Sequence, residues 1–485
     1  MVIMELSFAA LLEELREQRL EIRTDSRRMA RGDVFVALRG NMHDATAFIP
    51  RALEAGASVI VCGADGADLV RESAVRLVIH EDIRAALWQM AQARYHTDTL
   101  PFPVLGVTGT NGKTTTVFLL EHLFASRGKK SGILGTVSYR WPGFQSAAPL
   151  TTPGSPELHA MLDAMRRAGV EAAVMEVSSH AIAQQRVGGV QFAGAIFTNL
   201  TQDHLDYHPD MEGYYAAKAK LFLELPASDK VCAVNSDDPY GLRLLQTLKT
   251  SIGFGLRGNK TGRAHLAGKI LSSGRDGLHL SMNFGGVCWE LRSPLIGAFN
   301  AMNLLGVQAL CLGLGLSPND LACLETFKGL PGRLERITNP KCFHAFVDYA
   351  HTPDALANVL QALRAAGFAR IVTVFGCGGN RDRTKRPLMG AAAAKYSDVV
   401  VLTSDNPRKE EPAAIMDDVL PGLKEARQLV QEPDRRRATQ RALEMLGPED
   451  ALLVAGKGHE DYQIIGEKRF PYSDQQVIRE FLGCV

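Results

Sequence analysis

The sequence predicts an α/β protein with several domains, two of which are built on parallel sheets covered by helices. Short, nearly continuous apolar runs alternate with Gly-rich or polar breaks and helical patterns between residues 103 and 234, and again after about residue 335. Such runs are typical of strands buried on both faces of a parallel sheet. At 485 residues the chain also exceeds what one hydrophobic core usually organises, so we expect three domains.

The three domains are expected at residues 1–98, 99–332 and 333–485. The first is predicted to be a smaller α/β domain, with strands at 34–38, 59–61 and 77–79 around a helix near 49–55. Strands are expected in the central domain at 104–107, 131–137, 172–177, 194–197 and 231–234, and in the third domain at 344–347, 371–375, 399–402 and 452–455. Prolines bound a predicted linker at 99–103, and a second Gly/Pro stretch at 329–332 predicts a hinge.

Composition excludes several classes of partner. A net charge of +1 leaves no basic field for nucleic acid or an anionic membrane, and a basic run at 435–437 is predicted to be a solvated face without function. No apolar run reaches the roughly 18 residues of a membrane helix, and the acidic, Arg-containing start does not resemble a secretory signal. The eight cysteines lack a CxxC pair, which favours buried reduced thiols over zinc or disulfides. We therefore expect a cytoplasmic protein, without membrane insertion, and a monomer.

A phosphate-binding loop is the strongest local signal. Residues 106–115 read GVTGTNGKTT, after an apolar strand and before a helical pattern. Glycines let backbone amides approach a polyphosphate, Lys113 can meet the terminal phosphates, and Thr114 offers a hydroxyl to magnesium. The usual GxxxxGK[ST] pattern places its first glycine at position 107, which is Val107 here. The loop predicts a nucleoside triphosphate site but does not choose among motors, kinases, switches and ligases.

The spelling TGTNGKTT resembles that of the Mur ligases and the folylpolyglutamate synthetases. Further motifs similar to those of Mur ligases follow in one order: EVSSH at 176–180, TNLTQDHLDYH at 198–208, GAFNAMN at 297–303, PGRLE at 331–335, DYAHTP at 348–353 and GKGHE at 456–460. The resemblance spans residues 24 to 475. It implies the three-domain Mur ligase architecture: an N-terminal UDP-binding domain, a central P-loop ATPase domain with a parallel sheet, and a C-terminal Rossmann-like α/β domain for the incoming amino acid.

The resemblance also implies roles around ATP and metal. Glu176 ends an apolar strand at the sheet edge where ligands bind, which favours a magnesium ligand beside Thr114 over a helix cap. His204 is a second metal ligand by resemblance alone. Lys218 matches the position that carries a carbamate formed with CO2, with Lys220 as the rival position; an exposed helical lysine is the simpler reading. The implied ATP-binding residues are Gly109, Thr110, Asn111, Gly112, Lys113, Thr114, Thr115, Asn300, Asn303, Arg333, Asp348 and His351.

The N-terminal motifs TDSRR at 24–28 and GDVFVALRG at 32–40 resemble the uridine-nucleotide domain of the muramoyl-tripeptide branch. Ser26, Asn41, Met42 and His43 are then expected to contact the UDP end. The positions that match the muramoyl dipeptide site are Thr151, Thr152, Ser178, Gln184 and Arg186. Asp44-Ala45 departs from the expected Asp-Gly, which puts the UDP contacts of that loop in question.

The third domain indicates the amino acid. The stretch SDNPRKEEP at 404–412 is similar to the diaminopimelate-adding branch of the family. Meso-diaminopimelate differs from lysine by a distal carboxylate, for which the Arg408 guanidinium is a natural bidentate partner, although a surface arginine after a proline turn is the simpler reading. The full set expected at this site is Arg381, Asp405, Asn406, Pro407, Arg408, Gly456 and Glu460.

Together these resemblances imply ATP-dependent ligation of meso-2,6-diaminopimelate to UDP-N-acetylmuramoyl-L-alanyl-D-glutamate in peptidoglycan precursor synthesis. The acyl phosphate is the expected intermediate, with Mg²⁺ and ATP at the central site. Three alternatives stay open: the same ligase acting on L-lysine, a folate-tailing ligase, and a nucleotide-binding scaffold that has lost catalysis. A substrate swap separates the first, the need for a UDP-linked substrate the second, and ATP binding without product the third.

Overall fold

The computed structural model describes residues 4–17, 20–38, 44–70, 75–224, 226–258 and 264–484. Asn41, Met42 and His43 lie outside the described residues, so the predicted UDP contacts there are not placed. The chain forms two compact units. The first holds Met1–Thr108, Phe124–Ile196 and Asp210–Cys232, and the second holds Gly109–Leu123, Phe197–Pro209 and Ala233–Val485.

The N-terminal part of the first unit is a five-stranded parallel sheet with the strand order β1-β5-β4-β3-β2. Its strands are β1 (Met4–Glu5), β2 (Ile22–Arg23), β3 (Val34–Val36), β4 (Val59–Cys62) and β5 (Arg76–Ile79). Alternate side chains of β3 enter different cores: Val34 and Val36 pack with α1 (Phe8–Arg16) and α3 (Ile83–Tyr95), whereas Phe35 packs with α2 (Ile49–Glu54). The strands predicted at 34–38, 59–61 and 77–79 and the helix near 49–55 are confirmed as β3, β4, β5 and α2.

The rest of the first unit is built on sheet strands in the order β11-β6-β10-β7-β8-β9. The buried parallel strands are β6 (Val104–Thr108), β7 (Ser131–Leu134) and β10 (Ala172–Glu176), with β11 (Phe192–Phe197) beside β6. An antiparallel hairpin, β8 (Ser138–Trp141) and β9 (Phe144–Ala147), extends the sheet at one edge and was not predicted. The helices of this part are α5 (Ser155–Arg167), α6 (Ser179–Ala183), α7 (Met211–Leu223) and the C-terminal end of α4 (Lys113–Ser126).

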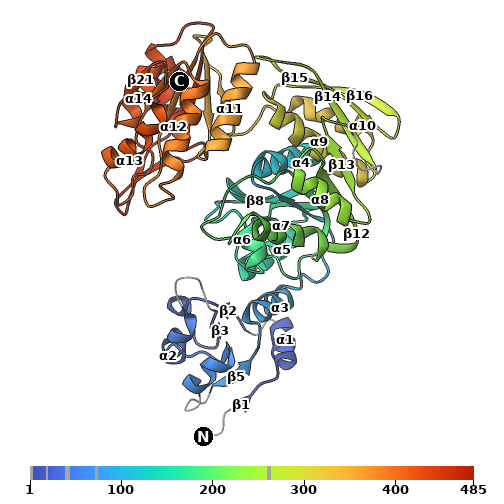
Figure 1. Cartoon of the computed structure of the whole chain (residues 1–485). Coiled ribbons are helices and arrows are strands. Elements are labelled where there is room, and N and C mark those ends of the chain that lie inside the picture. The colour runs from blue at the N-terminus through green and yellow to red at the C-terminus, as the bar shows by residue number, and fades with distance from the viewer. Residues whose placement is uncertain are drawn as a thin grey trace. The chain divides into compact units, whose positions relative to one another are not determined.

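The second unit holds strands in the order β12-β13-β14-β15-β16. These are β12 (Pro226–Asn235), β13 (Ile252–Gly255), β14 (His265–Gly274), β15 (Gly277–Phe284) and β16 (Val287–Ser293). β12 to β14 are parallel, whereas β14 to β16 form the long antiparallel ribbon drawn in yellow-green in Figure 1. The helices α8 (Pro239–Thr247), α9 (Ala298–Gly313) and α10 (Pro318–Leu321) belong to this part. The antiparallel ribbon was not predicted.

The C-terminal sheet has the order β17-β18-β22-β19-β20-β21, and β17 alone is antiparallel to its neighbour. Its strands are β17 (Glu335–Ile337), β18 (His344–Asp348), β19 (Ile371–Phe375), β20 (Val399–Leu402), β21 (Leu429–Gln431) and β22 (Ala451–Ala455). One face packs on α11 (Pro353–Ala365), α12 (Lys385–Tyr396) and α13 (Pro412–Val419), and the other on α14 (Arg435–Glu444) and α15 (Asp474–Leu482). The hairpin of β23 (Tyr462–Ile465) and β24 (Lys468–Pro471) stands apart from this sheet. The predicted doubly covered parallel sheet is confirmed.

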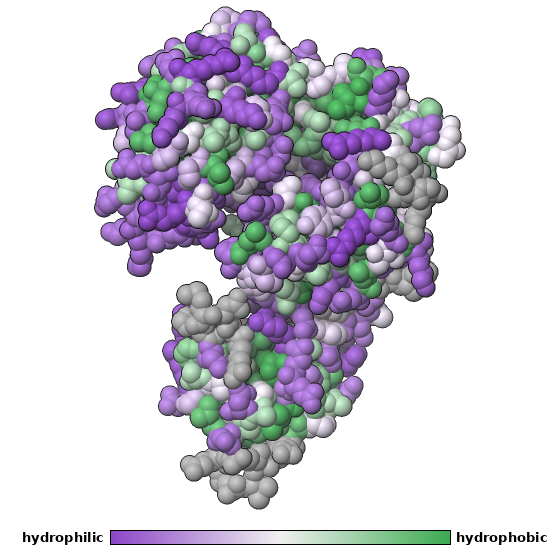
Figure 2. Space-filling model, viewed as in Figure 1, coloured by the Kyte–Doolittle hydropathy of each residue, from purple (hydrophilic) through white to green (hydrophobic). Residues whose placement is uncertain are grey.

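Surface hydropathy agrees with the predictions made from composition, whereas the exposure of some cysteines and of Arg435 does not. On the face shown in Figure 2, hydrophilic side chains predominate and exposed hydrophobic residues lie in small, separate groups. Among the described residues, no helix is both long and apolar enough to cross a membrane. The predicted burial of the cysteines holds for Cys62, Cys232, Cys311 and Cys377, whereas Cys288 and Cys342 are exposed. The prediction for residues 435–437 is wrong at Arg435, whose side chain is fully buried against Asp474, a residue 39 positions later in the sequence.

His159, fully buried on α5, should make stability depend on pH. Its Nε2 donates to the Gly188 carbonyl at 3.1 Å, and its Nδ1 bonds to the Thr97 hydroxyl, so neutral imidazole satisfies both ring nitrogens without a buried charge. Burial lowers the pKa of His159 to about 4 from 6.5. Because the unfolded chain takes up this proton at higher pH than the folded chain, the stabilisation is complete above pH 6.5 and is lost as pH falls towards 4.

We expect His159 to contribute on the order of 3 kcal/mol to this pH dependence. Replacing His159 by glutamine should flatten the fall in melting temperature between neutral and acidic pH. His122→Gln is the matched control, since His122 bonds through Nε2 to Cys323 and Thr326 at a half-exposed position. Equal acid sensitivity of the His159→Gln variant and the parent would contradict this assignment.

Candidate active site

The phosphate loop follows β6 and opens α4. Gly109 has a φ of 150°, and a Cβ there would lie 1.9 Å from the Thr198 hydroxyl oxygen; Gly112 has a φ of 87°, and a Cβ there would lie 2.4 Å from Asn303 Oδ1. Neither position can carry a side chain without displacing its neighbour. Val107 is a buried residue of β6. The departure from the usual glycine pattern therefore falls in the strand, and the tight part of the loop begins at Gly109.

The segment after β11 holds this loop in place. Asn199 accepts from the Asn111 amide through Oδ1 at 2.9 Å and donates through Nδ2 to the Asn111 carbonyl at 3.1 Å. The Thr198 hydroxyl donates to the same carbonyl at 2.6 Å, and the Thr110 hydroxyl accepts from the Thr201 amide at 3.0 Å. These contacts fix the loop backbone before any nucleotide binds, which lowers the cost of ordering it around phosphates.

Cationic groups gather at the loop. Lys113 Nζ donates to the carbonyls of Gly109 at 2.9 Å and Thr110 at 2.8 Å, so the ammonium lies across the loop. Arg333 Nη2 donates to the buried Thr114 hydroxyl at 3.1 Å, and its guanidinium stacks over the Tyr349 ring at 4.6 Å. Arg333 Nε is buried without a hydrogen-bond partner in the described part of the chain. The arrangement can attract and neutralise a polyphosphate.

The other residues expected near ATP are placed in different ways. Asn303 donates to Asn300 at 3.1 Å and packs against Gly112, so the structure brings this pair to the loop. Asp348 is buried, and its carboxylate accepts from the amides of Leu334 at 2.6 Å and Ala350 at 2.7 Å. Burial raises the pKa of Asp348, and the Arg333 charge opposes that rise. Asp348 therefore organises the turn that carries Arg333. His351 is exposed, with Nδ1 2.9 Å from the Tyr349 carbonyl oxygen.

Glu176 ends β10 in a fully buried position within the first unit. Its Oε1 accepts from the Thr136 amide at 2.8 Å and its Oε2 from the Thr136 hydroxyl at 3.1 Å. A Cβ on Gly135 would lie 2.6 Å from Oε1, so the glycine backbone packs closely against that oxygen. A buried carboxylate with lone pairs beyond these two hydrogen bonds fits a hard divalent cation such as magnesium.

His204 lies on the loop that follows β11, in the second unit. Its φ is 55°, its side chain is 42% exposed, and its Nε2 is 3.4 Å from Asp203 Oδ2. The described residues contain no group of three or more His, Cys, Asp or Glu side chains arranged around a metal. The prediction that His204 binds a metal is thus neither supported nor contradicted by a ligand cluster.

Burial separates the two candidate lysines on α7. Lys218 is 1% exposed and its Nζ lies 4.7 Å from the centre of the Tyr214 ring. Lys220 is 49% exposed and forms an ion pair with Glu224 at 3.9 Å. The reading of Lys218 as an exposed helical lysine is therefore wrong.

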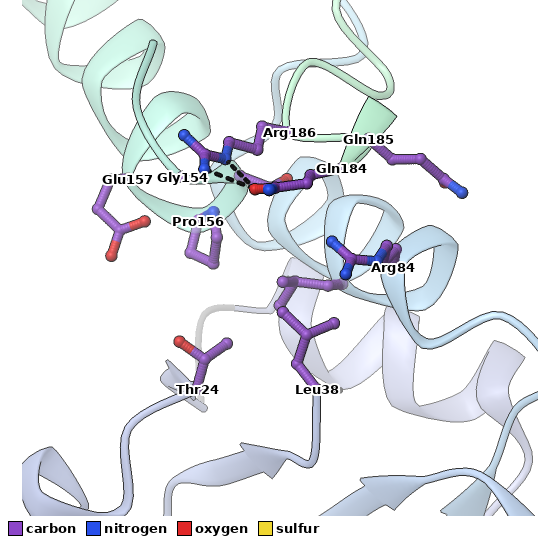
Figure 3. A pocket seen from close by; sticks show the side chains of 11 residues that line it. Thr24, Leu38, Arg84, Gly154, Pro156, Glu157, Gln184, Gln185 and Arg186 are labelled. Carbon is purple, nitrogen blue, oxygen red and sulfur yellow. Dashed lines mark hydrogen bonds between the residues drawn. The ribbon is translucent and has the colours of Figure 1, made fainter. Parts of the chain in front are cut away.

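A pocket in the first unit collects part of the predicted dipeptide site (Figure 3). Arg186 donates to Gln184 Oε1 through Nε at 2.9 Å and to the Thr152 carbonyl through Nη1 at 3.2 Å. Arg84 from α3 and Glu157 from α5 also face the pocket and were not predicted. The complete lining is Thr24, Leu38, Arg84, Leu87, Gly154, Ser155, Pro156, Glu157, Gln184, Gln185 and Arg186.

The remaining residues expected at this site do not line the pocket, and Thr152 accepts a hydrogen bond from Arg186, which does. Thr152 is fully buried, and its hydroxyl donates to the Glu176 carbonyl at 2.8 Å and accepts from the Ser178 amide at 3.0 Å. Ser178 caps α6 by accepting from the Ala181 amide, and Thr151 lies 3.1 Å from the Thr136 hydroxyl. Ser26 is buried at the start of a short 3-10 helix near Thr24. These contacts link the pocket to Glu176.

The loops after β19, β20 and β22 meet at one edge of the C-terminal sheet. Arg408 has a φ of 53°, and its Nη1 donates to the Gly379 carbonyl at 2.9 Å. Buried Asn406 donates to Glu460 Oε2 at 2.9 Å and accepts from Lys457 Nζ at 2.9 Å. Burial lowers the pKa of Lys457, an effect that the Asp405 charge opposes. Both charge signs therefore lie at the carboxyl edge of the strands, where open α/β sheets bind ligands.

Gly456, Pro407 and Arg381 complete the expected set at this edge. A Cβ on Gly456 would lie 2.8 Å from Asp405 Oδ2, and the Gly456 φ is 115°, so glycine is required there. The Pro407 carbonyl lies 1.9 Å from where a Cβ on Gly379 would stand, which packs the two loops closely. Arg381 is exposed at the loop surface. The structure brings Asp405, Asn406, Pro407, Arg408, Gly456 and Glu460 together, with Arg381 exposed on the neighbouring loop.

Three family models match the chain in sequence order. The model of the Mur ligase family catalytic domain matches residues 21–95, that of the Mur ligase middle domain matches 107–311, and that of the Mur ligase glutamate ligase domain matches 332–458. The chain belongs to the Mur ligase family. This Mur ligase accordingly has the ATP-dependent ligase architecture that the motifs implied.

Individual relatives cover this Mur ligase almost completely. A UDP-N-acetylmuramoyl-L-alanyl-D-glutamate--2,6-diaminopimelate ligase from Lawsonia intracellularis is 55% identical over 98% of both chains. The protein of the same name from Synechococcus elongatus is 43% identical over 94% of this chain and 93% of its own. A solved structure of a ligase of that name is 31% identical, covers 96% of this chain and 94% of its own, and has a TM-score of 0.68.

Several residues that organise this Mur ligase site were missed. Asn199 lies in a recognised motif, and its position directly after a buried strand could have marked it. No comparable sequence signal marks Arg84 and Glu157, because each lines the pocket only together with residues that are distant in the sequence.

Gly135→Ala should impair the Mur ligase without unfolding it. The added Cβ needs the space beside Glu176 Oε1, and a displacement of about 1 Å at a reacting centre costs on the order of 10²-fold in rate. Kinetics and melting temperature measured together check this expectation. Gly274→Ala, where nothing lies within 4 Å, is the matched control and should keep full activity. A fully active Gly135→Ala enzyme would show that the position of Glu176 is unimportant.

Proposed function

We propose that this Mur ligase joins meso-2,6-diaminopimelate to UDP-N-acetylmuramoyl-L-alanyl-D-glutamate at the expense of ATP, giving the UDP-linked tripeptide, ADP and phosphate for peptidoglycan. The observation that carries the choice of amino acid is Arg408. Its guanidinium is held by the Gly379 carbonyl beside Asn406 and Glu460, where it suits a distal carboxylate that lysine lacks. The names of the full-length relatives support the same substrates.

The first chemical step is transfer of the γ-phosphoryl group. The D-glutamyl carboxylate of the UDP-linked substrate attacks the γ-phosphorus of ATP; an oxygen–phosphorus bond forms, the bond to the β-phosphate oxygen breaks, and ADP leaves. Positioning and charge neutralisation dominate the catalysis of such transfers. Lys113 and the phosphate loop supply both, with Arg333 as a further cation from the hinge that follows residue 332.

The second step forms the amide. The neutral amine of diaminopimelate adds to the acyl-phosphate carbon, and the tetrahedral intermediate expels phosphate as the amine loses a proton. Arg408 holds the distal carboxylate during this step, while the Glu460 carboxylate, held in place by Asn406, can accept from the ammonium end of the amino acid. Gln184 and Arg186 line the pocket proposed for the acceptor dipeptide.

Magnesium is the metal that the donors suit. Glu176 and Thr114 offer hard oxygen ligands, and His204 is a further candidate by resemblance. A bound magnesium ion would offset the negative charge of the phosphates. Lys218 is the proposed carbamate site: it is buried on α7, and conversion to an anionic carbamate needs the neutral amine.

The proposal also covers the domain boundaries, the cellular location, the oligomeric state and the partners of the enzyme. We place domain boundaries near residues 99 and 332, and the gaps between the three family matches support that choice. A cytoplasmic location, a monomeric state and small molecules as the only partners complete it. Size-exclusion chromatography with light scattering tests the oligomeric state.

Steady-state phosphate release tests the reaction. Purified protein receives ATP, magnesium and either UDP-N-acetylmuramoyl-L-alanyl-D-glutamate or a folate acceptor, with or without diaminopimelate. Phosphate release should require the UDP-linked substrate together with diaminopimelate. Release with the folate acceptor would indicate the folate-tailing activity, and ATP binding without release under any condition would indicate a binding protein.

A further inference from the structure

Two fully buried arginines hold the loop that carries Arg408. Arg386 lies in the first turn of α12, and Arg435 is the first residue of α14. Burying a guanidinium is costly unless it is paired and hydrogen-bonded, and both arginines pair with carboxylates, although Arg386 Nε has no hydrogen-bond partner among the described residues.

Arg386 holds the far end of this loop. Its Nη1 donates to Glu410 Oε2 at 2.9 Å and its Nη2 to Glu410 Oε1 at 3.0 Å, a bidentate pair. Nη1 also donates to Asp418 at 2.7 Å, and Nη2 to the Gly378 carbonyl at 3.3 Å. Glu410 is two residues after Arg408, and Gly378 precedes the Gly379 carbonyl that accepts from Arg408. One side chain therefore ties together both loops that meet at Arg408.

Arg435 holds the near end. Its Nε and Nη2 donate to the two oxygens of buried Asp474 at 2.9 and 2.8 Å. Nη2 also donates to the Ala455 carbonyl at 2.9 Å, and Nη1 to the Ser404 carbonyl at 3.4 Å. Ser404 and Ala455 directly precede Asp405 and Gly456. Arg435 thus joins the exits of β20 and β22, from which the proposed amino-acid loops leave.

We propose that Arg386 and Arg435 are positioning residues that set the selectivity of this Mur ligase for diaminopimelate, by fixing the two ends of the loop 404–410. This inference rests on the proposed function of Arg408. Only a planar guanidinium can make these bidentate and carbonyl contacts together, so lysine at either position keeps the charge but loses the geometry. Binding groups need to be held within about 0.5 Å of their productive positions, which makes selectivity sensitive to such a loss.

Arg386→Lys and Glu410→Gln test the far end, and Arg435→Lys tests the near end. Arg383→Lys is the matched control, since Arg383 also pairs with Asp418 at 2.9 Å but is 67% exposed; Arg436→Lys, paired with Glu480 on the surface, controls for Arg435. The KM values for diaminopimelate, ATP and the UDP-linked substrate are measured, together with the ratio of kcat/KM for diaminopimelate over L-lysine. Arg408→Ala is assayed in parallel.

The proposal expects the far-end variants to raise the KM for diaminopimelate about tenfold and to lower the selectivity ratio, with the KM for ATP unchanged. The controls should match the parent. If Arg435→Lys does not fold, the KM values and the selectivity ratio of Arg386→Lys and Glu410→Gln test the proposal. A lower melting temperature with all KM values unchanged would overturn the proposal. If Arg408→Ala itself leaves the diaminopimelate KM unchanged, the proposed function of Arg408 fails instead.

Discussion

Lys113→Ala is expected to lower kcat by roughly 10³-fold. The ammonium is the cation nearest the phosphate loop backbone, where it donates to the Gly109 and Thr110 carbonyls at 2.9 and 2.8 Å. In the transition state of phosphoryl transfer the same group stabilises charge that develops on the γ-phosphate oxygens. Phosphate release at saturating concentrations of all three substrates measures the effect.

The melting temperature of Lys113→Ala shows whether a loss of activity comes from unfolding. Asn199 and Thr198 hold the loop independently of Lys113, so the melting temperature of Lys113→Ala should stay close to that of the parent. Lys113→Arg keeps the charge with a different shape and should recover little of the rate. An alanine variant within tenfold of the parent kcat would show that another group neutralises the phosphate.

Arg408→Ala is expected to raise the KM for diaminopimelate about 100-fold. A bidentate arginine–carboxylate pair makes two charge-assisted hydrogen bonds, each worth about 1.5–3 kcal/mol, and water recovers part of that loss. The KM for ATP should not change, because the contacts of the phosphate loop do not include Arg408. Initial rates against diaminopimelate concentration measure the effect.

Lys409→Ala controls for a general loss of positive charge near this loop. Lys409 follows Arg408, is 68% exposed and pairs with Glu467 at the surface, so its removal should leave every KM close to that of the parent. If Lys409→Ala and Arg408→Ala weaken diaminopimelate binding equally, the site senses net charge rather than the geometry of one guanidinium.

Much of the fold could be predicted because buried parallel strands have a plain local signature. The runs at 371–375 and 399–402 agree with β19 and β20 residue for residue. The ribbon β14 to β16 escaped prediction even though Leu278, Leu280 and Met282 alternate with less buried residues. The three strands follow one another without intervening helices, so they do not fit the strand–helix repeat on which the prediction was based.

The candidate site was predictable where a motif combines special backbone geometry with chemistry. Gly109 and Gly112 are examples, because their positive φ values and close neighbours leave glycine as the only residue that fits. Burial of Lys218 and Arg435 was not predictable. Each is a charged residue, for which exposure is the usual expectation, and its buried environment comes from residues brought near by the fold.

A competition experiment tests the central claim most directly. The enzyme receives ATP, magnesium, UDP-N-acetylmuramoyl-L-alanyl-D-glutamate, and equal concentrations of meso-diaminopimelate and L-lysine, and the UDP-linked products are identified by mass spectrometry. We predict a product that contains diaminopimelate, in large excess over any lysine product. A product that contains mainly lysine would contradict the role given to Arg408, and the absence of both products would contradict the proposed ligase reaction.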